Sequence, residues 1–206
     1  MDSIKHPKYY ILIAGLVTLF GIGGVGLGLM YFFHKSLFYP LLIHPARSIA
    51  IQFVIGTIYA LIALIPLTIL LQLKMLDGTR HFFADLLLRF KVRFPQILFL
   101  SLCAGIGEEL LFRGAIQPWL GIWLTSILFI ALHGYLNPKN KPLLIYGIVL
   151  LVVSAGFGYL LPKYGIYSAM SAHFWIDVVL MLYLKKAASK LKLKFSVAIL
   201  MQFLIN

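Results

Sequence analysis

The sequence predicts an all-α, polytopic membrane protein, a bundle of about six to seven transmembrane helices with a further amphipathic helix at the membrane surface. Three observations indicate this fold. Apolar residues make up 62% of the 206 residues and charged residues only 12%, about half the fraction found in soluble domains. The apolar residues gather in runs of roughly 20, the length that an α-helix needs to cross a bilayer. Lysines and arginines lie almost entirely between those runs.

The apolar runs form one integral membrane domain over residues 1–206. The short run at 121–135 is bounded by Pro118 and Pro138. A last run at 195–205 has only 11 residues, so we expect either a half-buried seventh helix or an interfacial tail. The six predicted membrane helices cover residues 9–33, 49–73, 97–120, 121–135, 143–161 and 166–184.

Two segments have additional patterns. The first predicted membrane helix carries six glycines between residues 15 and 28, which favours close packing of its backbone against another helix in lipid. In residues 79–94, apolar side chains alternate with charged, mostly basic ones. This pattern is typical of an amphipathic helix lying on the membrane surface, and an ordinary helix in a cytosolic loop is the alternative.

The distribution of basic residues predicts the orientation. If the N-terminus is cytoplasmic, the inner segments hold 14 lysines and arginines and the outer segments hold 3. We therefore expect a multi-pass protein of the cell membrane with a cytoplasmic N-terminus. The net charge of +12 does not indicate nucleic-acid binding, because the basic residues are spread among the segments between membrane helices. The expected partners are the lipid bilayer and a membrane-associated protein or peptide substrate, with no nucleic acid.

A few ionisable residues lie inside the predicted membrane helices. A charged residue at the bilayer centre costs roughly 2.5–3.5 kcal/mol on insertion scales, so these side chains must face inward and meet one another. Ionisable residues in this position mark functional sites by default. They are Glu108, Glu109, Arg113, His133, His173 and Asp177.

Helical spacing predicts which of these side chains meet. Glu109 and Arg113 are four residues apart, on one helical face, and can form an ion pair. Glu108 is rotated by about 100° from Glu109 and therefore points toward a different neighbour. On two further helices, a histidine has a companion four residues away: Phe129 for His133, and Asp177 for His173. The alternative is a buried polar network that only fixes helix packing.

Three motifs in this region resemble those of a known family. Residues 108–113 match EExxxR, residues 129–133 match FxxxH, and residues 173–177 match HxxxN with aspartate in the last place. Together and in this order they are similar to the CPBP family of CAAX proteases and bacteriocin-processing enzymes, also called the Abi family. The resemblance covers about residues 97–184, the core that carries the motifs.

The resemblance implies roles for individual residues. In the family, the first glutamate of EExxxR and the histidine of FxxxH activate a water molecule, which points to Glu108 and His133 here. A carboxylate in an apolar bundle is a stronger base than in water, in agreement with this role. His173 and Asp177 correspond to the pair that stabilises the oxyanion.

The aspartate departs from the family pattern, because an ionised carboxylate repels an oxyanion. Asp177 would have to be protonated or would orient His173. The resemblance also implies that Glu109, Arg113 and Phe129 support the site structurally.

The sequence contains no HExxH motif, and we expect no metal cofactor. If the enzyme were metal-dependent, Glu108, His133 and His173 would be the ligands, since carboxylate and imidazole bind zinc. The motifs of other intramembrane proteases, Gly-x-Gly-Asp and Gly-x-Ser-Gly, are absent as well.

The sequence therefore predicts a CPBP-type intramembrane endopeptidase that hydrolyses a peptide bond of a membrane-associated protein or peptide through a water activated by glutamate and histidine. Two alternatives belong to other classes. A catalytically silent membrane scaffold or bacteriocin-immunity protein would be expected to lose motif residues, yet only the final asparagine is replaced. A proton-coupled transporter would usually show inverted repeats, and the sequence has no internal repeat.

Overall fold

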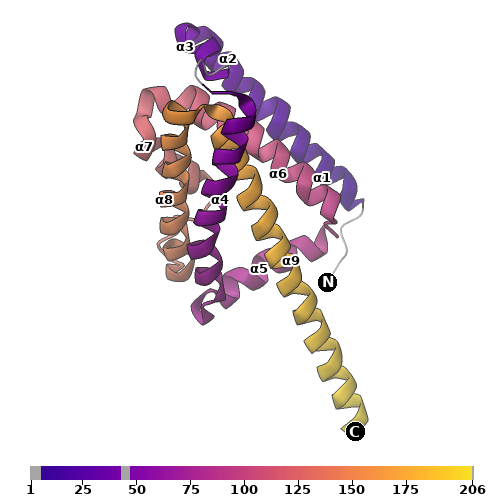
Figure 1. Cartoon of the computed structure of the whole chain (residues 1–206). Coiled ribbons are helices and arrows are strands. Elements are labelled where there is room, and N and C mark those ends of the chain that lie inside the picture. Colours follow the sequence, from indigo (N-terminus) through magenta and orange to yellow (C-terminus); the bar gives the residue numbers. More distant parts are fainter. Residues whose placement is uncertain (1–5, 43–46, 206) are drawn as a thin grey trace.

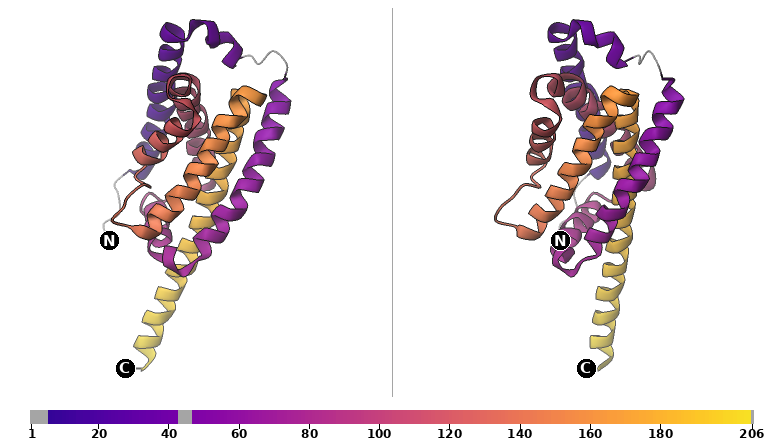
Figure 2. Two further views of the ribbon diagram at one scale, coloured as in Figure 1. Left: turned by 90° about the vertical axis from the view of Figure 1, so that its left-hand side faces the viewer. Right: turned by 60° about the vertical axis from the view of Figure 1, so that its left-hand side comes forward.

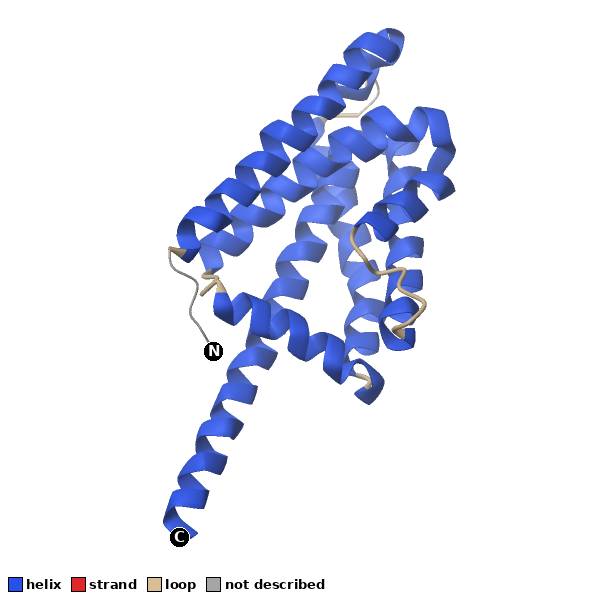
Figure 3. Cartoon of the chain, turned by 180° about the vertical axis from the view of Figure 1, so that it is seen from behind, coloured by secondary structure: helices blue, strands red, loops and turns tan. Residues whose placement is uncertain are grey.

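A computed structural model describes residues 6–42 and 47–205 of the chain. Within these residues all regular structure is helical (Figure 3). In chain order the elements are α1 (Pro7–Leu16), η1 (Val17–Ile22), α2 (Gly23–Phe33), α3 (Lys35–Leu42), α4 (Ile49–Gln72), η2 (Lys74–Leu76), α5 (Asp77–Arg89), α6 (Phe94–Glu109), η3 (Leu110–Ile116), α7 (Gln117–Leu132), α8 (Lys141–Tyr164) and α9 (Ile166–Ile205).

The helices form a membrane bundle (Figure 1). Long apolar side chains cover the outward faces of the helices, as a lipid-facing surface requires, whereas small and apolar side chains of α4, α8 and α9 fill a common core. The predicted all-α membrane fold is confirmed. Five helical segments among the described residues are long and apolar enough to cross a membrane: Pro7–Phe33, Ile49–Gln72, Phe94–Leu132, Lys141–Tyr164 and Ile166–Ala187.

The sequence predicts six or seven membrane helices, whereas the structure has five segments of sufficient length among the described residues. The first cause of this difference is the segment Phe94–Leu132. The predicted helices 97–120 and 121–135 both lie in it. Gly121 has φ 71° and ψ 176°, a backbone conformation that favours glycine, and here the chain turns back (Figure 2). The part of α7 after Gly121 is about 17 Å long at about 1.5 Å per residue, so it reaches only partway across a hydrocarbon core of about 30 Å.

The second difference concerns the end of the chain. Residues 195–205 do not form a separate seventh helix, because α9 is one continuous helix from Ile166 to Ile205 that extends beyond the bundle (Figure 1). The sequence from 166 to 205 contains neither glycine nor proline, so nothing in it interrupts the helix.

The helix predicted at 79–94 is present as α5, which crosses α9 at the end of the bundle that also holds the start of α1 (Figure 3). The loop between α7 and α8 lies at this same end, whereas α3 lies at the opposite end (Figure 2). The described segments that the count of lysines and arginines assigned to the cytoplasmic side therefore lie at one end of the bundle.

The glycines of the first membrane helix pack closely, as predicted. The unbroken helix α1–η1–α2 lies against α6 and η3 (Figure 1). A Cβ atom at Gly23 would lie 3.0 Å from the Cα of Gly107, and one at Gly26 would meet the backbone of Leu110 and Leu111 at still shorter distances. Only glycine permits this approach, and it holds the helix that carries both glutamates against its neighbour.

Candidate active site

The ionisable residues of three helices meet in the interior of the bundle. Glu108, at the end of α6, places its Oε2 atom 3.5 Å from Nε2 of His133, which follows α7. The same oxygen lies 3.9 Å from Nε2 of His173 on α9. Nε2 of His173 lies in turn 3.6 Å from Oδ2 of Asp177. The structure thus brings together all four residues that the sequence identified as candidate catalytic groups.

The turn at Gly121 explains how Glu108 and His133 reach the same depth. Counted from the inner end of each helix, the two residues would lie at different depths. Counted from the turn, Glu108 precedes Gly121 by thirteen residues and His133 follows it by twelve. At about 1.5 Å per residue, both lie about 18–20 Å from the turn. The short α7 therefore presents His133 in the middle of the bundle.

Behind this group lies a fully buried ion pair. The side chains of Glu109 and Arg113 are 0% exposed, and Nη1 of Arg113 donates to Oε1 of Glu109 at 3.0 Å, as their spacing predicted. Nη2 of Arg113 donates to the carbonyl oxygen and to Oγ of Ser154 on α8, at 2.9 and 2.6 Å. Oε1 of Glu109 also lies 2.8 Å from Nδ1 of His173. The pair links α6 and η3 to α8 and α9.

Aromatic rings enclose the buried cation. The guanidinium of Arg113 lies 4.7 Å from the ring centroid of Phe129 and 5.3 Å from that of Phe157. These are cation–π distances, which add to the stabilisation of a desolvated cation. The ring of Phe157 also stacks on that of His173, with centroids 5.6 Å apart. Phe129 and Phe157 therefore fix both Arg113 and His173 in position.

A tight C-terminal cap positions His133. The N–H of Gly134 donates to the carbonyl of Ala131 and that of Tyr135 to the carbonyl of Ile130, the hydrogen-bond pattern of a Schellman motif. Gly134 has φ 77°, the left-handed conformation that this cap requires. Nδ1 of His133 lies 2.7 Å from the carbonyl oxygen of Phe129. Since a carbonyl only accepts, Nδ1 carries the proton and Nε2 faces Glu108.

The atoms nearest to the Glu108 carboxylate are mainly hydrogen-bond acceptors. The Nδ1 atom of His173 donates to the Glu109 carboxylate, so its Nε2 atom also faces the carboxylates of Glu108 and Asp177. Oε2 of Glu108 is buried and has no hydrogen-bond partner in the part of the chain that the structure describes. A buried acceptor without a partner costs about 1–3 kcal/mol or more when charged. A donor such as a water molecule between Glu108 and the histidines relieves this cost.

The donor atoms of Glu108, His133 and His173 are of a type that zinc binds. Among residues 6–42 and 47–205, however, no three His, Cys, Asp or Glu side chains are grouped so that they could hold a metal ion. The residues named as ligands for a metal-dependent enzyme therefore do not fit a three-ligand site in this arrangement.

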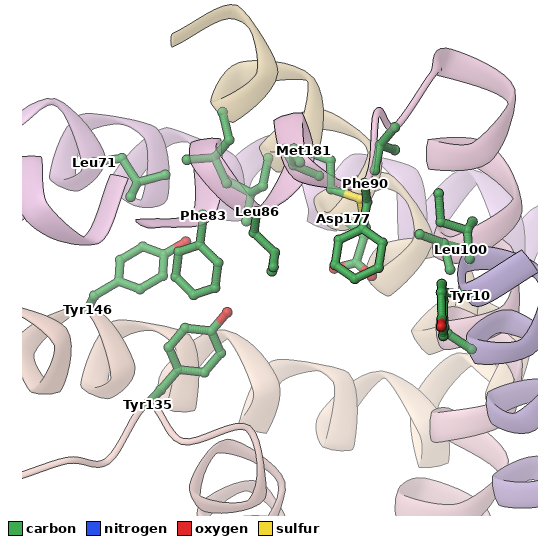
Figure 4. A pocket seen from close by; sticks show the side chains of 16 residues that line it. Tyr10, Leu71, Phe83, Leu86, Phe90, Leu100, Tyr135, Tyr146, Asp177 and Met181 are labelled. Atoms are coloured by element: carbon green, nitrogen blue, oxygen red, sulfur yellow. The ribbon is translucent and has the colours of Figure 1, made fainter. Parts of the chain in front are cut away.

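Two cavities adjoin the cluster. The larger has a volume of about 560 Å³, is walled mainly by apolar side chains, most of them from α1, α5 and α9, and includes Asp177, Tyr135 and Tyr146 (Figure 4). The smaller, about 340 Å³, lies between the start of α5 and the α7–α8 loop and includes His133 and Tyr135. Burial, with the charges of Asp177 and Glu108, raises the pKa of Tyr135 to about 12, so its hydroxyl keeps its proton.

Three residues of this site were not found by sequence reasoning. Ser154 and Phe157 lie on α8, which carries no motif, and appear in the sequence as ordinary residues of an apolar run. Tyr135 follows the FxxxH motif by two residues. Gly134, between His133 and Tyr135, was the available signal. A glycine directly after the last residue of a helix predicts a C-terminal cap, which directs the next residue back toward the helix.

Comparisons with known proteins find similarity in this region. Residues 90–179, which contain all three motifs, match the family model described as type II CAAX prenyl endopeptidase Rce1-like. The uncharacterized protein YpbD of Bacillus subtilis (strain 168) is 38% identical over 86 residues, which is 41% of this chain and 43% of the Bacillus protein. The match thus spans less than half of that relative's length. No solved structure matches the chain significantly.

Proposed function

We propose that this protein is an intramembrane endopeptidase that hydrolyses a peptide bond of a membrane-associated protein or peptide, in line with the match of residues 90–179 to the Rce1-like family model. The observation that carries the proposal is the position of Glu108. Its Oε2 atom is buried without a hydrogen-bond partner among the described residues, and it lies 3.5 Å from Nε2 of His133. That arrangement suits a carboxylate that takes a proton from water.

The proposed reaction needs only these side chains and one water molecule. The water contacts both Oε2 of Glu108 and Nε2 of His133 from one side, and its oxygen attacks the carbonyl carbon of the peptide while Glu108 accepts its proton. The carbon–nitrogen bond then breaks, and the departing amine receives from Glu108 the proton that the carboxylate took from water. Water is consumed, and the products are a carboxylic acid and an amine.

Glu109 and Arg113 act as support in this proposal. The Glu109 carboxylate holds Nδ1 of His173, so the ring presents Nε2 to the reacting group. The Asp177 carboxylate lies 3.6 Å from Nε2 of His173, on the side of the ring that faces Glu108. A protonated Nε2 can donate to a developing oxyanion, which a neutral ring in this tautomer cannot.

We also propose that the N-terminus is cytoplasmic and that the substrate reaches the site from that side. The 14-to-3 distribution of basic residues supports this orientation. Reporter fusions after Lys163 and after Lys186 should then report opposite sides of the membrane, the second cytoplasmic. Equal signals, or the reverse pattern, would contradict the orientation.

Cleavage of a peptide library tests the proposed activity. Purified protein in lipid vesicles is incubated with lipid-anchored, internally quenched peptides of varied sequence, and products are identified by mass spectrometry. The wild type should cleave a subset, and Glu108→Gln should lower the rate by about 10²- to 10⁴-fold, the usual contribution of a general base.

Asp85→Asn is the matched control. It makes the same carboxyl-to-amide change on α5, where Asp85 pairs with Arg89 at the exposed surface. This variant should cleave like the wild type. A library that the wild type leaves intact, or equal cleavage by wild type and Glu108→Gln, would contradict the proposed function.

A further inference from the structure

Peptide hydrolysis requires hydrogen-bond donors as well as a base, and most donors of this site are occupied. As water attacks, negative charge develops on the carbonyl oxygen of the peptide, and a fixed donor aimed at that oxygen accelerates the reaction. Nδ1 of His133 is bound to a backbone carbonyl, and Nδ1 of His173 to Glu109. The Nη atoms of Arg113 are bound to Glu109 and Ser154. The carboxylates can only accept while they are ionised.

Tyr135 offers a donor that is not occupied in this way. Its hydroxyl points into the larger cavity, where Asp177 also lies (Figure 4). The same residue lines the smaller cavity together with His133. No hydrogen bond from the Tyr135 hydroxyl is formed to any residue in the described parts of the chain. A peptide that reaches His133 from either cavity therefore passes Tyr135.

The position of the ring is well determined. The Schellman motif after α7 fixes the backbone of Tyr135, two residues after His133. The ring stacks with that of His133 at a centroid distance of 6.4 Å. It also contacts the rings of Phe83 at 6.0 Å and Tyr146 at 5.9 Å. A donor that is fixed before the substrate binds loses little freedom during the reaction, which is what oxyanion stabilisation requires.

We propose that Tyr135 is a further catalytic residue, whose hydroxyl donates a hydrogen bond to the carbonyl oxygen of the peptide bond that is cleaved. This inference rests on the proposed protease function and adds a residue to it. The phenol supplies the neutral donor that a carboxylate at position 177 cannot supply while it is ionised. Tyr135 and His173 then face the oxyanion, while Glu108 and His133 hold the water.

Tyr135→Phe tests the inference, with Tyr146→Phe as the matched control. Tyr146 lines the larger cavity and touches the ring of Tyr135, but it does not line the smaller cavity with His133. On the peptide that the wild type cleaves fastest, Tyr135→Phe should lower kcat by about 10²-fold, the effect of removing one oxyanion donor, with KM changed less than about twofold. Tyr146→Phe should change neither constant by more than about twofold.

A second measurement separates catalysis from packing. A phosphinic analogue of the same peptide carries anionic oxygens where the tetrahedral intermediate has them, so it reports interactions made in the transition state. Tyr135→Phe should weaken inhibition by this analogue about 10²-fold. It should leave unchanged the binding of the amide peptide, measured in the Glu108→Gln background.

The outcomes distinguish this inference from the proposed function. If Glu108→Gln abolishes cleavage while Tyr135→Phe retains the wild-type kcat, the protease stands and the role of Tyr135 is wrong. A raised KM with unchanged kcat also overturns it, because Tyr135 would then only contact the substrate. If Glu108→Gln cleaves like the wild type, the proposed function itself fails.

Discussion

The two halves of the polar cluster differ in burial and in whether their charged side chains lie within hydrogen-bond distance of one another. In the inner half, Arg113 donates hydrogen bonds to both Glu109 and Ser154, and the glutamate and arginine side chains are fully buried. In the outer half, the side chains of Glu108, His133 and Asp177 are 14%, 36% and 26% exposed. These groups lie 3.5–3.9 Å from their nearest charged neighbours, beyond normal hydrogen-bond distance.

This difference separates structural support from chemistry. A buried charge without a partner is expensive, so the ion pair of the inner half stabilises the fold only while both Glu109 and Arg113 are present. The outer half borders two cavities, and we propose that it binds a water molecule and a substrate. His173 belongs to both, because its Nδ1 atom is bonded to Glu109 and its Nε2 atom faces Glu108. We therefore propose that the two neighbouring glutamates have different functions.

Loss of Glu109 should break the inner half and have the largest effect on folding. Glu109→Gln leaves the fully buried Arg113 without its counter-charge and weakens the bond to His173. Removal of one partner of a buried ion pair costs about 3–5 kcal/mol. We expect a lower yield and a lower melting temperature in detergent, measured on purified protein.

Glu108→Gln is the matched variant for this comparison, since it makes the same change one residue earlier. Its carboxylate has no partner within hydrogen-bond distance in the described chain, so stability should be unchanged or slightly higher. Equal loss of stability in both variants would show that the two halves form one structural network, contrary to the distinction drawn above.

Much of the fold and site follows from residue patterns that are local. The length of the apolar runs predicted a membrane bundle, and the four-residue spacing predicted the Glu109–Arg113 pair. The glycines at 23 and 26 predicted close helix packing, and in the structure they lie against the helix that carries Glu108. These features could be predicted because helical geometry alone determines them.

Other features depend on tertiary structure and were missed for that reason. The conformation of Gly121 turns one apolar segment back on itself, and nothing in a hydrophobic run indicates the depth of such a turn. Without the turn at Gly121, Glu108 and His133 would lie at different depths in the membrane. Ser154 and Phe157 have no motif, because their function is to contact Arg113 from another helix. The role proposed for Tyr135 could not be predicted from the sequence, because it depends on the two cavities that the folded chain forms around this residue.

The most direct test of the account is a double-mutant cycle on Glu108 and His133. The central claim is that both side chains act on one water molecule. Glu108→Gln and His133→Ala should each lower kcat/KM by about 10²- to 10⁴-fold. If they share the water, the double variant should be no more than about threefold slower than the slower single variant, since residues that act as a unit are not additive. A double variant whose loss equals the product of the two single losses would contradict the claim.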